Sequence, residues 1–520
     1  MSPVLFVVLA IAPALLMLLA ALACLSAQVP VGRLWQGLVS LSCLALVGLL
    51  AVACGGQHTD LLQPFLRISS LSPASLVAVL VQLLGSVIAA FSARYLAGEP
   101  HQRRFIAALA GVLAAVQILL LADHWLVLIA AWALVGIVLR QLLCFYPERP
   151  FAQLAAHKKQ IADRLADGLL IGAAAFAWFA VGSGSLSALT QHIADSGMSP
   201  ALQASALLLV LAVILRSALM PVHGWLIQVM EAPTPVSALL HAGVVNLGGF
   251  VLIRFAPLLQ QAIPARAVLL LFGLTTAVLA GMVMLTRISI KVKLAWSTVA
   301  QMGFMLVECS LGLYTLALLH LIGHSLYKAQ AFLAASSVVR QTRLAALRGE
   351  AASLGASLLY APLLSVALVL VVHWFSGLAA WPWWWCLVLG FSWAPLLWLP
   401  RDRSDFRAAA LQHLSGMLMV VGMTAIALLA HRLPLGLHDT PHTGLGLIAL
   451  AGMTALYACL AVLQRQPRAL QTWRRWSYAG FYVDEAFTRL ALRIWPARWG
   501  QRSTQSFEPT FSAGLATGEY

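Results

Sequence analysis

Long apolar stretches alternate with short polar segments along almost the whole chain. A stretch of about 20 apolar residues is long enough to cross the hydrocarbon core of a bilayer as an α-helix. The pattern therefore predicts an all-α, polytopic membrane protein with about fifteen spanning helices. Their approximate bounds are 3–26, 34–54, 73–93, 106–122, 124–142, 163–182, 201–220, 234–255, 266–286, 292–309, 313–338, 354–376, 383–400, 408–430 and 443–464.

Composition agrees with a membrane protein. Of the 520 residues, 61% are hydrophobic and only 9% are charged, whereas soluble domains contain roughly 25% charged residues. The first stretch lacks a basic start and is too long for a signal peptide, so we interpret it as a spanning helix. The seven cysteines form no C-x-x-C pair, and neither a phosphate-binding loop nor an H-E-x-x-H motif occurs. We therefore expect no metal, no cofactor and no catalytic site on this chain.

Basic residues are distributed unevenly between the two sides of the predicted bundle. Of the 32 Lys and Arg residues, 26 lie in alternate loops and the C-terminal tail on one side. The positive-inside rule then places the N-terminus outside and the C-terminus in the cytoplasm. This bias accounts for most of the formal charge of +15, so nucleic-acid binding is not expected.

The chain divides into two parts by composition. Residues 1–464 are predicted to form the membrane domain, and residues 465–520 mix Trp and Tyr with basic residues. That mixture is typical of the membrane–water interface. The tail is expected to lie along the cytoplasmic membrane surface or against a partner.

Three ionisable residues share one face of the predicted helix 313–338. His320, His324 and Lys328 follow one another at i, i+4 and i+8. Ionisable groups inside a membrane are costly, so each one is a functional candidate, and histidine and desolvated lysine exchange protons readily. The column therefore suggests a path for protons. Alternatively, the histidines merely hydrogen-bond to the backbone or to neighbouring helices.

Polar residues also surround the proline-rich segment after Arg216, which includes His223 and Glu231. Prolines interrupt helical hydrogen bonding, and broken helices at membrane depth line wet cavities. Glu231 could pair with Arg216 or His223, and His241 lies further along in the next predicted helix. The alternative is an ordinary turn in which Glu231 compensates a helix dipole.

Two further groups lie at predicted helix starts. Lys291 is a candidate for the ion path, although Lys291 and Lys293 are also typical interfacial anchors. Asp163, Arg164 and Asp167 could form the cytoplasmic mouth of a path, or a helix cap with its counter-ion.

Four segments together resemble a known family: residues 216–225 (RSALMPVHGW), 230–242 (MEAPTPVSALLHA), 291–303 (KVKLAWSTVAQMG) and 320–328 (HLIGHSLYK). They are similar to the proton-pumping membrane subunits of complex I and of the multisubunit sodium/proton antiporters. The resemblance covers residues 85–340. It implies an antiporter-like fold with a broken seventh helix, a second break in helix twelve, and protons crossing through the buried charged residues.

Three positions depart from the family pattern. Arg216 stands where the family has a lysine in helix seven, and arginine is a poor proton carrier. The family's acidic partner in helix five is replaced by Ala133, after Trp132. In residues 360–385 only His373 is ionisable, so the family's Ser-Lys-Asp stretch is missing.

Further segments resemble DabB-type membrane subunits of inorganic-carbon accumulation complexes: residues 232–235 (APTP), 246–250 (NLGGF) and 482–489 (YVDEAFTR). The resemblance implies a bacterial inner-membrane protein whose cation flow drives CO2 hydration on a large cytoplasmic partner. That partner, DabA, would bind zinc and resemble a β-carbonic anhydrase. Two alternatives remain open, a proton-pumping subunit of a respiratory or hydrogenase-type complex, and a non-conducting membrane anchor.

Overall fold

The structure is a computed structural model of the whole chain. It describes residues 2–56, 58–59, 61–62, 65–335, 354–378, 381–399, 406–466 and 470–496. The end of the predicted helix 313–338, the basic loop that follows it, and the tail beyond residue 496 lie outside the described residues.

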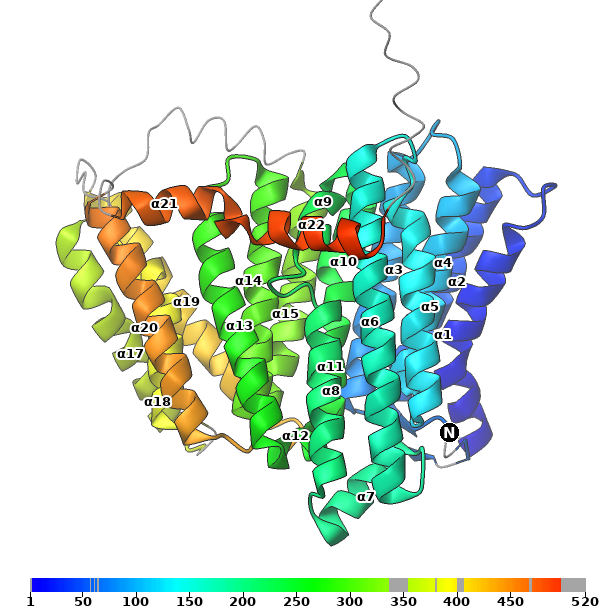
Figure 1. The fold of residues 1–520 in the computed structure, drawn as a ribbon, viewed down its shortest axis with the longest axis horizontal. Helices are drawn as coiled ribbons and strands as arrows, with labels where there is room; N and C mark the ends of the chain where they lie inside the picture. Colours follow the sequence, from blue (N-terminus) through cyan, green and yellow to red (C-terminus); the bar gives the residue numbers. More distant parts are fainter. Residues whose placement is uncertain are drawn as a thin grey trace, which may run out of the picture.

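Helices make up nearly all of the described chain (Figure 1). The α-helices are α1 (Pro3–Ala23), α2 (Val31–Cys54), α3 (Pro73–Tyr95), α4 (Gln102–Leu121), α5 (Trp125–Leu143), α6 (Pro150–Val181), α7 (Leu186–Ser196), α8 (Pro200–Arg216), α9 (Gly224–Gln228), α10 (Thr234–Ala242), α11 (Leu247–Arg254), α12 (Ala256–Gln261), α13 (Ile263–Met284), α14 (Ile290–Leu311), α15 (Tyr314–Leu333), α17 (Gly355–Ser376), α18 (Trp383–Trp393), α19 (Phe406–Ala430), α20 (Thr443–Arg465), α21 (Gln471–Tyr478) and α22 (Val483–Ile494). The 3-10 helices are η1 (Val229–Glu231), η2 (Val244–Asn246), η3 (Ala394–Leu397) and η4 (Gly480–Tyr482), and the strands β1 (His58–Thr59) and β2 (Ile68–Ser69) form one short hairpin.

The prediction of an all-α polytopic membrane protein is confirmed. Within the described ranges, twelve helical segments are long and apolar enough to cross a membrane. Large apolar side chains point outward from the bundle, with Phe179 84% and Trp374 82% exposed. Such surfaces are stable in lipid and unfavourable in water. The predicted total of fifteen spans stays a prediction.

Helices α13 and α14 pack with their backbones in close contact. A Cβ atom added to Gly303 would lie 2.7 Å from the carbonyl oxygen of Gly273 and 2.7 Å from the amide nitrogen of Ala277. Small residues at such crossings allow tight van der Waals packing, which drives helix association where the surrounding lipid is equally apolar. This crossing fixes α14 beside the rest of the bundle.

The sixth helix is longer than the sequence pattern predicted. It starts at Pro150 rather than near residue 163, because proline suits the first turn of a helix and the buried charges that follow are paired. Lys158, Lys159 and Asp163 are therefore helical residues with buried side chains, and the prediction of a loop here was wrong.

The predicted eighth helix is interrupted. Residue Gly243, with φ −126° and ψ −73°, ends α10, and the chain continues through η2 into α11. Upstream, α8 ends at Arg216, and the short helix α9 begins at Gly224 after seven intervening residues. A break within a single seventh spanning helix stays a prediction. By contrast, α17 runs as one helix through Pro362, so the expected second break is not found in it.

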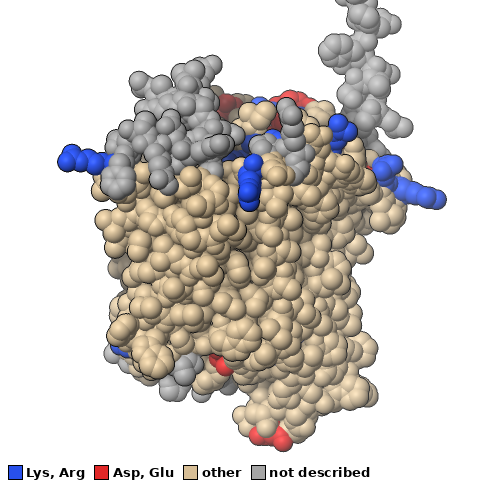
Figure 2. All heavy atoms as spheres, turned by 90° about the vertical axis from the view of Figure 1, so that its left-hand side faces the viewer, with Lys and Arg blue, Asp and Glu red and all other residues tan. Residues whose placement is uncertain are grey.

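The described part of the tail crosses one end of the bundle, where α21 and α22 run across the ends of the upright helices (Figure 1). We call this end the tail face. Helix α21 packs against α13, and α22 packs against α6. Figure 2 shows blue Lys and Arg side chains near this face and a broad uncharged belt below it. The assignment of the tail face to the cytoplasm remains a prediction.

Candidate functional site

The predicted column on α15 is a row of mostly buried polar side chains. The rings of His320 and His324 lie 6.1 Å apart between centroids, and both His324 and Lys328 are buried. Lys328 Nζ donates to the carbonyl oxygen of Leu294 (3.0 Å) and to the hydroxyl of Ser297. No carboxylate of the described residues lies within 4.0 Å of this ammonium. A buried lysine held only by neutral acceptors is a costly arrangement that needs a functional reason.

A carboxylate joins the other end of the column. Glu308 on α14 lies 2.8 Å from His320 Nδ1 through its Oε2 atom, and its side chain is 6% exposed. Glu308 was missed by the sequence analysis, although it lies within the predicted helix 292–309. The rule that marks ionisable residues inside spans would have found it.

His241 approaches the same column from α10, which packs against α15. Its ring stacks on Phe332 with centroids 4.6 Å apart, and Asn246 Nδ2 donates to the hydroxyl of Ser325 (2.7 Å). The ring nitrogens of His241 and His324 are buried, and neither histidine has a hydrogen-bond partner in the described part of the chain. Buried polar atoms without protein partners are typical sites for ordered water.

Arg216 forms a buried ion pair with Asp167 of α6. Its Nη1 atom also donates to the carbonyl oxygen of Trp132 (2.8 Å), and its guanidinium lies 4.6 Å from the centre of a Trp132 ring. The carboxylate that the family pattern places in helix five is thus supplied by α6, one helix further along. The suggested pairing of Glu231 with Arg216 or His223 is not found among the described ion pairs, because Asp167 of α6 lies beside Arg216 and Glu231 lies beside Arg149.

Other charges continue along α6. Lys159 Nζ lies 2.6 Å from Asp163 Oδ2 and donates to both of its oxygens, and Arg164 donates to Asp167 (3.1 Å). Asp163 and Asp167 have 8% and 12% exposed side chains, whereas Arg164 is 43% exposed. The two carboxylates are thus buried ion-pair partners rather than helix caps. A cavity of about 150 Å³ beside Lys159, Asp163 and Arg164 adjoins this row.

The remaining predicted residues are placed separately. Glu231 lies at the surface, 3.7 Å from Arg149, with both side chains 44% exposed. Lys291 is half-buried and donates to the hydroxyl of Thr234 (2.8 Å). His223 is fully buried with its ring 5.0 Å from a ring of Trp296. The structure therefore brings Arg216 and Asp167 together but leaves Glu231 apart from them.

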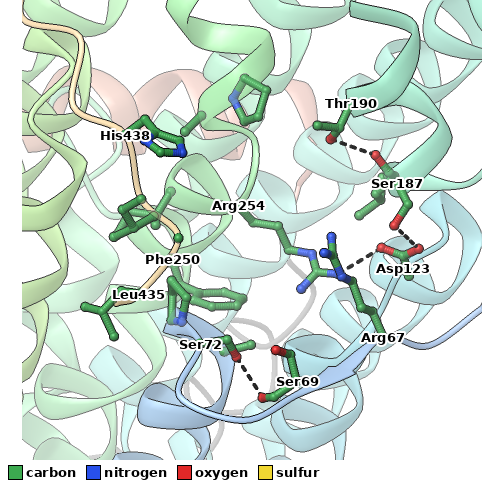
Figure 3. Close-up of a pocket in the computed structure, with 18 of the residues that line it drawn as sticks. Arg67, Ser69, Ser72, Asp123, Ser187, Thr190, Phe250, Arg254, Leu435 and His438 are labelled. Atoms are coloured by element: carbon green, nitrogen blue, oxygen red, sulfur yellow. Dashed lines mark hydrogen bonds and ion pairs between the residues drawn. The ribbon is translucent and has the colours of Figure 1, made fainter. Parts of the chain in front are cut away.

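The face opposite the tail contains a second polar site, which the sequence analysis missed. Arg254 of α11 donates to Asp123 (3.1 Å), and Ser187 donates to the same carboxylate (2.6 Å). Arg254, Asp123 and Ser187 line a cavity of about 520 Å³. Arg67 lines the same cavity. Figure 3 shows the side chains of Arg67 and Arg254 near Asp123. No periodic signal marks these residues, since they lie at helix ends that are distant in sequence.

The described residues contain no cluster of three or more His, Cys, Asp or Glu side chains that could hold a metal ion. Zinc on a partner remains an expectation. The polar side chains of the bundle include buried ion pairs and titratable groups, and such groups inside a membrane suit the movement of a cation.

Comparisons with known proteins show the family of the chain. Residues 122–392 match the family model described as "NADH:quinone oxidoreductase/Mrp antiporter, TM". A relative from Hydrogenovibrio crunogenus, named "Probable inorganic carbon transporter subunit DabB", is 39% identical over 82% of this chain and 83% of its own length. NADH-quinone oxidoreductase subunit L of Mycobacterium tuberculosis is 33% identical over 55% of this chain and 45% of that protein.

The fold is similar to a solved structure as well. A chain of the Mrp complex from Dietzia sp. aligns with a TM-score of 0.59 and 22% identity, over 96% of this chain and 61% of the Mrp chain. Similarity at this level of identity concerns the fold alone. The chain belongs to the NADH:quinone oxidoreductase/Mrp antiporter family and, within it, to the DabB group.

Proposed function

We propose that this chain is the cation-translocating membrane subunit of an inorganic carbon transporter, and that the cation is a proton. The observation that carries the proposal is Lys328, a buried ammonium without a carboxylate partner among the described residues, on one helix with His324 and His320. Its DabB relatives are named as subunits of inorganic carbon transporters. A non-conducting anchor would have no need of this buried charge.

The proposed route starts at the face opposite the tail. A proton reaches Glu308 and His320, passes along α15 to Lys328, and continues past His241 towards the tail face. Buried polar atoms without a partner in the described chain occur in Ser217, Ser237 and His223, and they support a water-filled connection to the charges of α6. Arg216 would hold a fixed positive charge beside this connection rather than carry the proton.

The partner of the proposed complex is a large cytoplasmic protein of the DabA type, with zinc and carbonic-anhydrase-like chemistry. Proton entry across the inner membrane would make hydration of CO2 to bicarbonate effectively one-way. One charge crossing 100 mV provides about 2.3 kcal/mol, which exceeds the roughly 1.4 kcal/mol of a tenfold change in an equilibrium constant. Purification from native membranes tests the partner: a stoichiometric zinc protein supports the proposal, and flavin or iron–sulfur subunits contradict it.

Lys328→Ala tests the route itself, with Lys293→Ala as the matched control because Lys293 is exposed on the adjoining helix. The purified complex is placed in liposomes, a membrane potential is imposed, and internal pH and sodium dyes are read. Lys328→Ala is expected to abolish proton entry while Lys293→Ala retains it. Unchanged proton entry in Lys328→Ala would remove the column from the mechanism, and sodium entry in place of proton entry would change the cation.

Carbon uptake in cells gives an independent measurement. Uptake through the proposed transporter stops when an uncoupler collapses the membrane potential and the pH gradient. Uptake that continues in the presence of the uncoupler would support a non-conducting anchor instead.

A further inference from the structure

A carboxylate of the tail enters the bundle at the tail face. Asp484 of α22 accepts a hydrogen bond from Lys158 Nζ of α6 through Oδ1, and one from Gln228 Nε2 (3.2 Å) through Oδ2. Thr488, one helical turn further along α22, accepts from the same ammonium (2.9 Å). Two residues of the tail therefore hold one buried lysine of the membrane domain.

The fit at this contact is close. A Cβ atom at position 224 would lie 1.4 Å from Asp484 Oδ1 and 2.6 Å from Lys158 Nζ. Only glycine at position 224 therefore leaves room for both groups. Because His223 directly precedes this glycine, a buried imidazole of the proposed route lies next to the contact in the chain.

The charge balance depends on the tail. The side chain of Lys158 is fully buried, at 0% exposure, and Asp484 is the only described carboxylate within 4.0 Å of its ammonium. The neighbouring Lys159 is paired with Asp163 instead. A buried ammonium without a counter-ion is strongly unfavourable. Helix α22 thus supplies the counter-charge that stabilises the buried ammonium of Lys158.

We propose that Asp484 is the last proton-exchanging group of the route at the tail face, and that Lys158 passes its proton to this carboxylate. The transfer converts the ammonium to a neutral amine and the carboxylate to a carboxylic acid, and the next proton that arrives along the proposed route protonates the amine again. The acid then releases the proton to water at the tail face, where the Asp484 side chain is 27% exposed. The inference rests on the proposed function, and it assigns to the tail a direct role in ion transport rather than anchoring alone.

Asp484→Asn tests this role, because the substitution preserves shape and removes the charge. Glu485→Gln is the matched control, since Glu485 is the next residue and is exposed. In liposomes containing the full complex, Asp484→Asn is expected to lower proton entry by about 100-fold, as for loss of a positioned acid–base group. Glu485→Gln is expected to leave it unchanged.

A second variant separates transport from folding. In Lys158→Gln/Asp484→Asn both charges are absent, so no buried charge lacks a partner and the complex should assemble. If Asp484 only neutralises Lys158, the double variant recovers proton entry, and this recovery overturns the inference. Normal proton entry in Asp484→Asn overturns it as well. Absence of proton entry in the unmodified complex would instead refute the proposed function.

Discussion

The ion pair between Arg216 and Asp167 offers a quantitative test of the buried charges. Their side chains are 3% and 12% exposed, so Asp167→Asn leaves the guanidinium buried with weaker compensation. Arg216 keeps its hydrogen bond to the Trp132 carbonyl, but that acceptor is neutral. Removing one partner of a buried pair costs about 3–5 kcal/mol, and we expect a loss of unfolding free energy in this range.

The measurement is a double-mutant cycle in mixed detergent micelles, with unfolding followed by circular dichroism. Asp167→Asn, Arg216→Gln and the double variant are compared, and the double variant is expected to be more stable than the sum of the two losses predicts. Arg164→Gln is the control, because its side chain is 43% exposed and such pairs contribute about 0–1 kcal/mol. Equal losses for Asp167→Asn and Arg164→Gln, or strict additivity in the cycle, would refute the reasoning.

Three further predictions concern other parts of the bundle. Glu308→Gln deprives His320 of its charged partner, a contact of about 1.5–3 kcal/mol, and should lower proton entry in liposomes about tenfold or more without loss of the folded complex. Outside the spans, burial lowers the pKa of His431, but hydrogen bonds to Asp439 and a backbone carbonyl outweigh burial and raise it above 6.5. This contact therefore contributes its full stability to the segment between α19 and α20 below pH 6.5, and the contribution is lost as the pH rises through the higher folded pKa. Amide hydrogen exchange in this segment should then increase with pH beyond its intrinsic rise. The increase should be smaller in His431→Gln. Finally, Gly303→Ala places a methyl group 2.7 Å from backbone atoms of α13 and should cost about 1–3 kcal/mol in the same micelle unfolding assay; an unchanged midpoint would contradict the close crossing.

Most spanning helices could be predicted from the sequence because lipid imposes a simple condition on every residue. Apolar length alone locates α13 and α20 to within a few residues of their observed bounds. The prediction failed for α6, whose first half carries Lys158, Lys159 and Asp163. These charges resemble a loop in sequence, but they become acceptable in a helix when neighbouring elements supply partners.

The site was predictable in part. The spacing of His320, His324 and Lys328 fixes their common face, since a helix repeats every 3.6 residues. The partner of Arg216 was not predictable, because helical periodicity says which side of a helix a residue occupies and nothing about which helix packs there. The pairing of Asp484 with Lys158 spans more than 300 residues and is visible only in the folded chain.

The sequence by itself determined the membrane-spanning architecture, the family and the α15 column, because each depends on local composition or spacing. Only the tertiary structure decided which charges meet: Asp167 with Arg216, Glu308 with His320, and Asp484 with Lys158. The physical reason is that a buried charge is tolerated through its contacts in three dimensions. Those contacts depend on helix packing, which local sequence patterns do not specify.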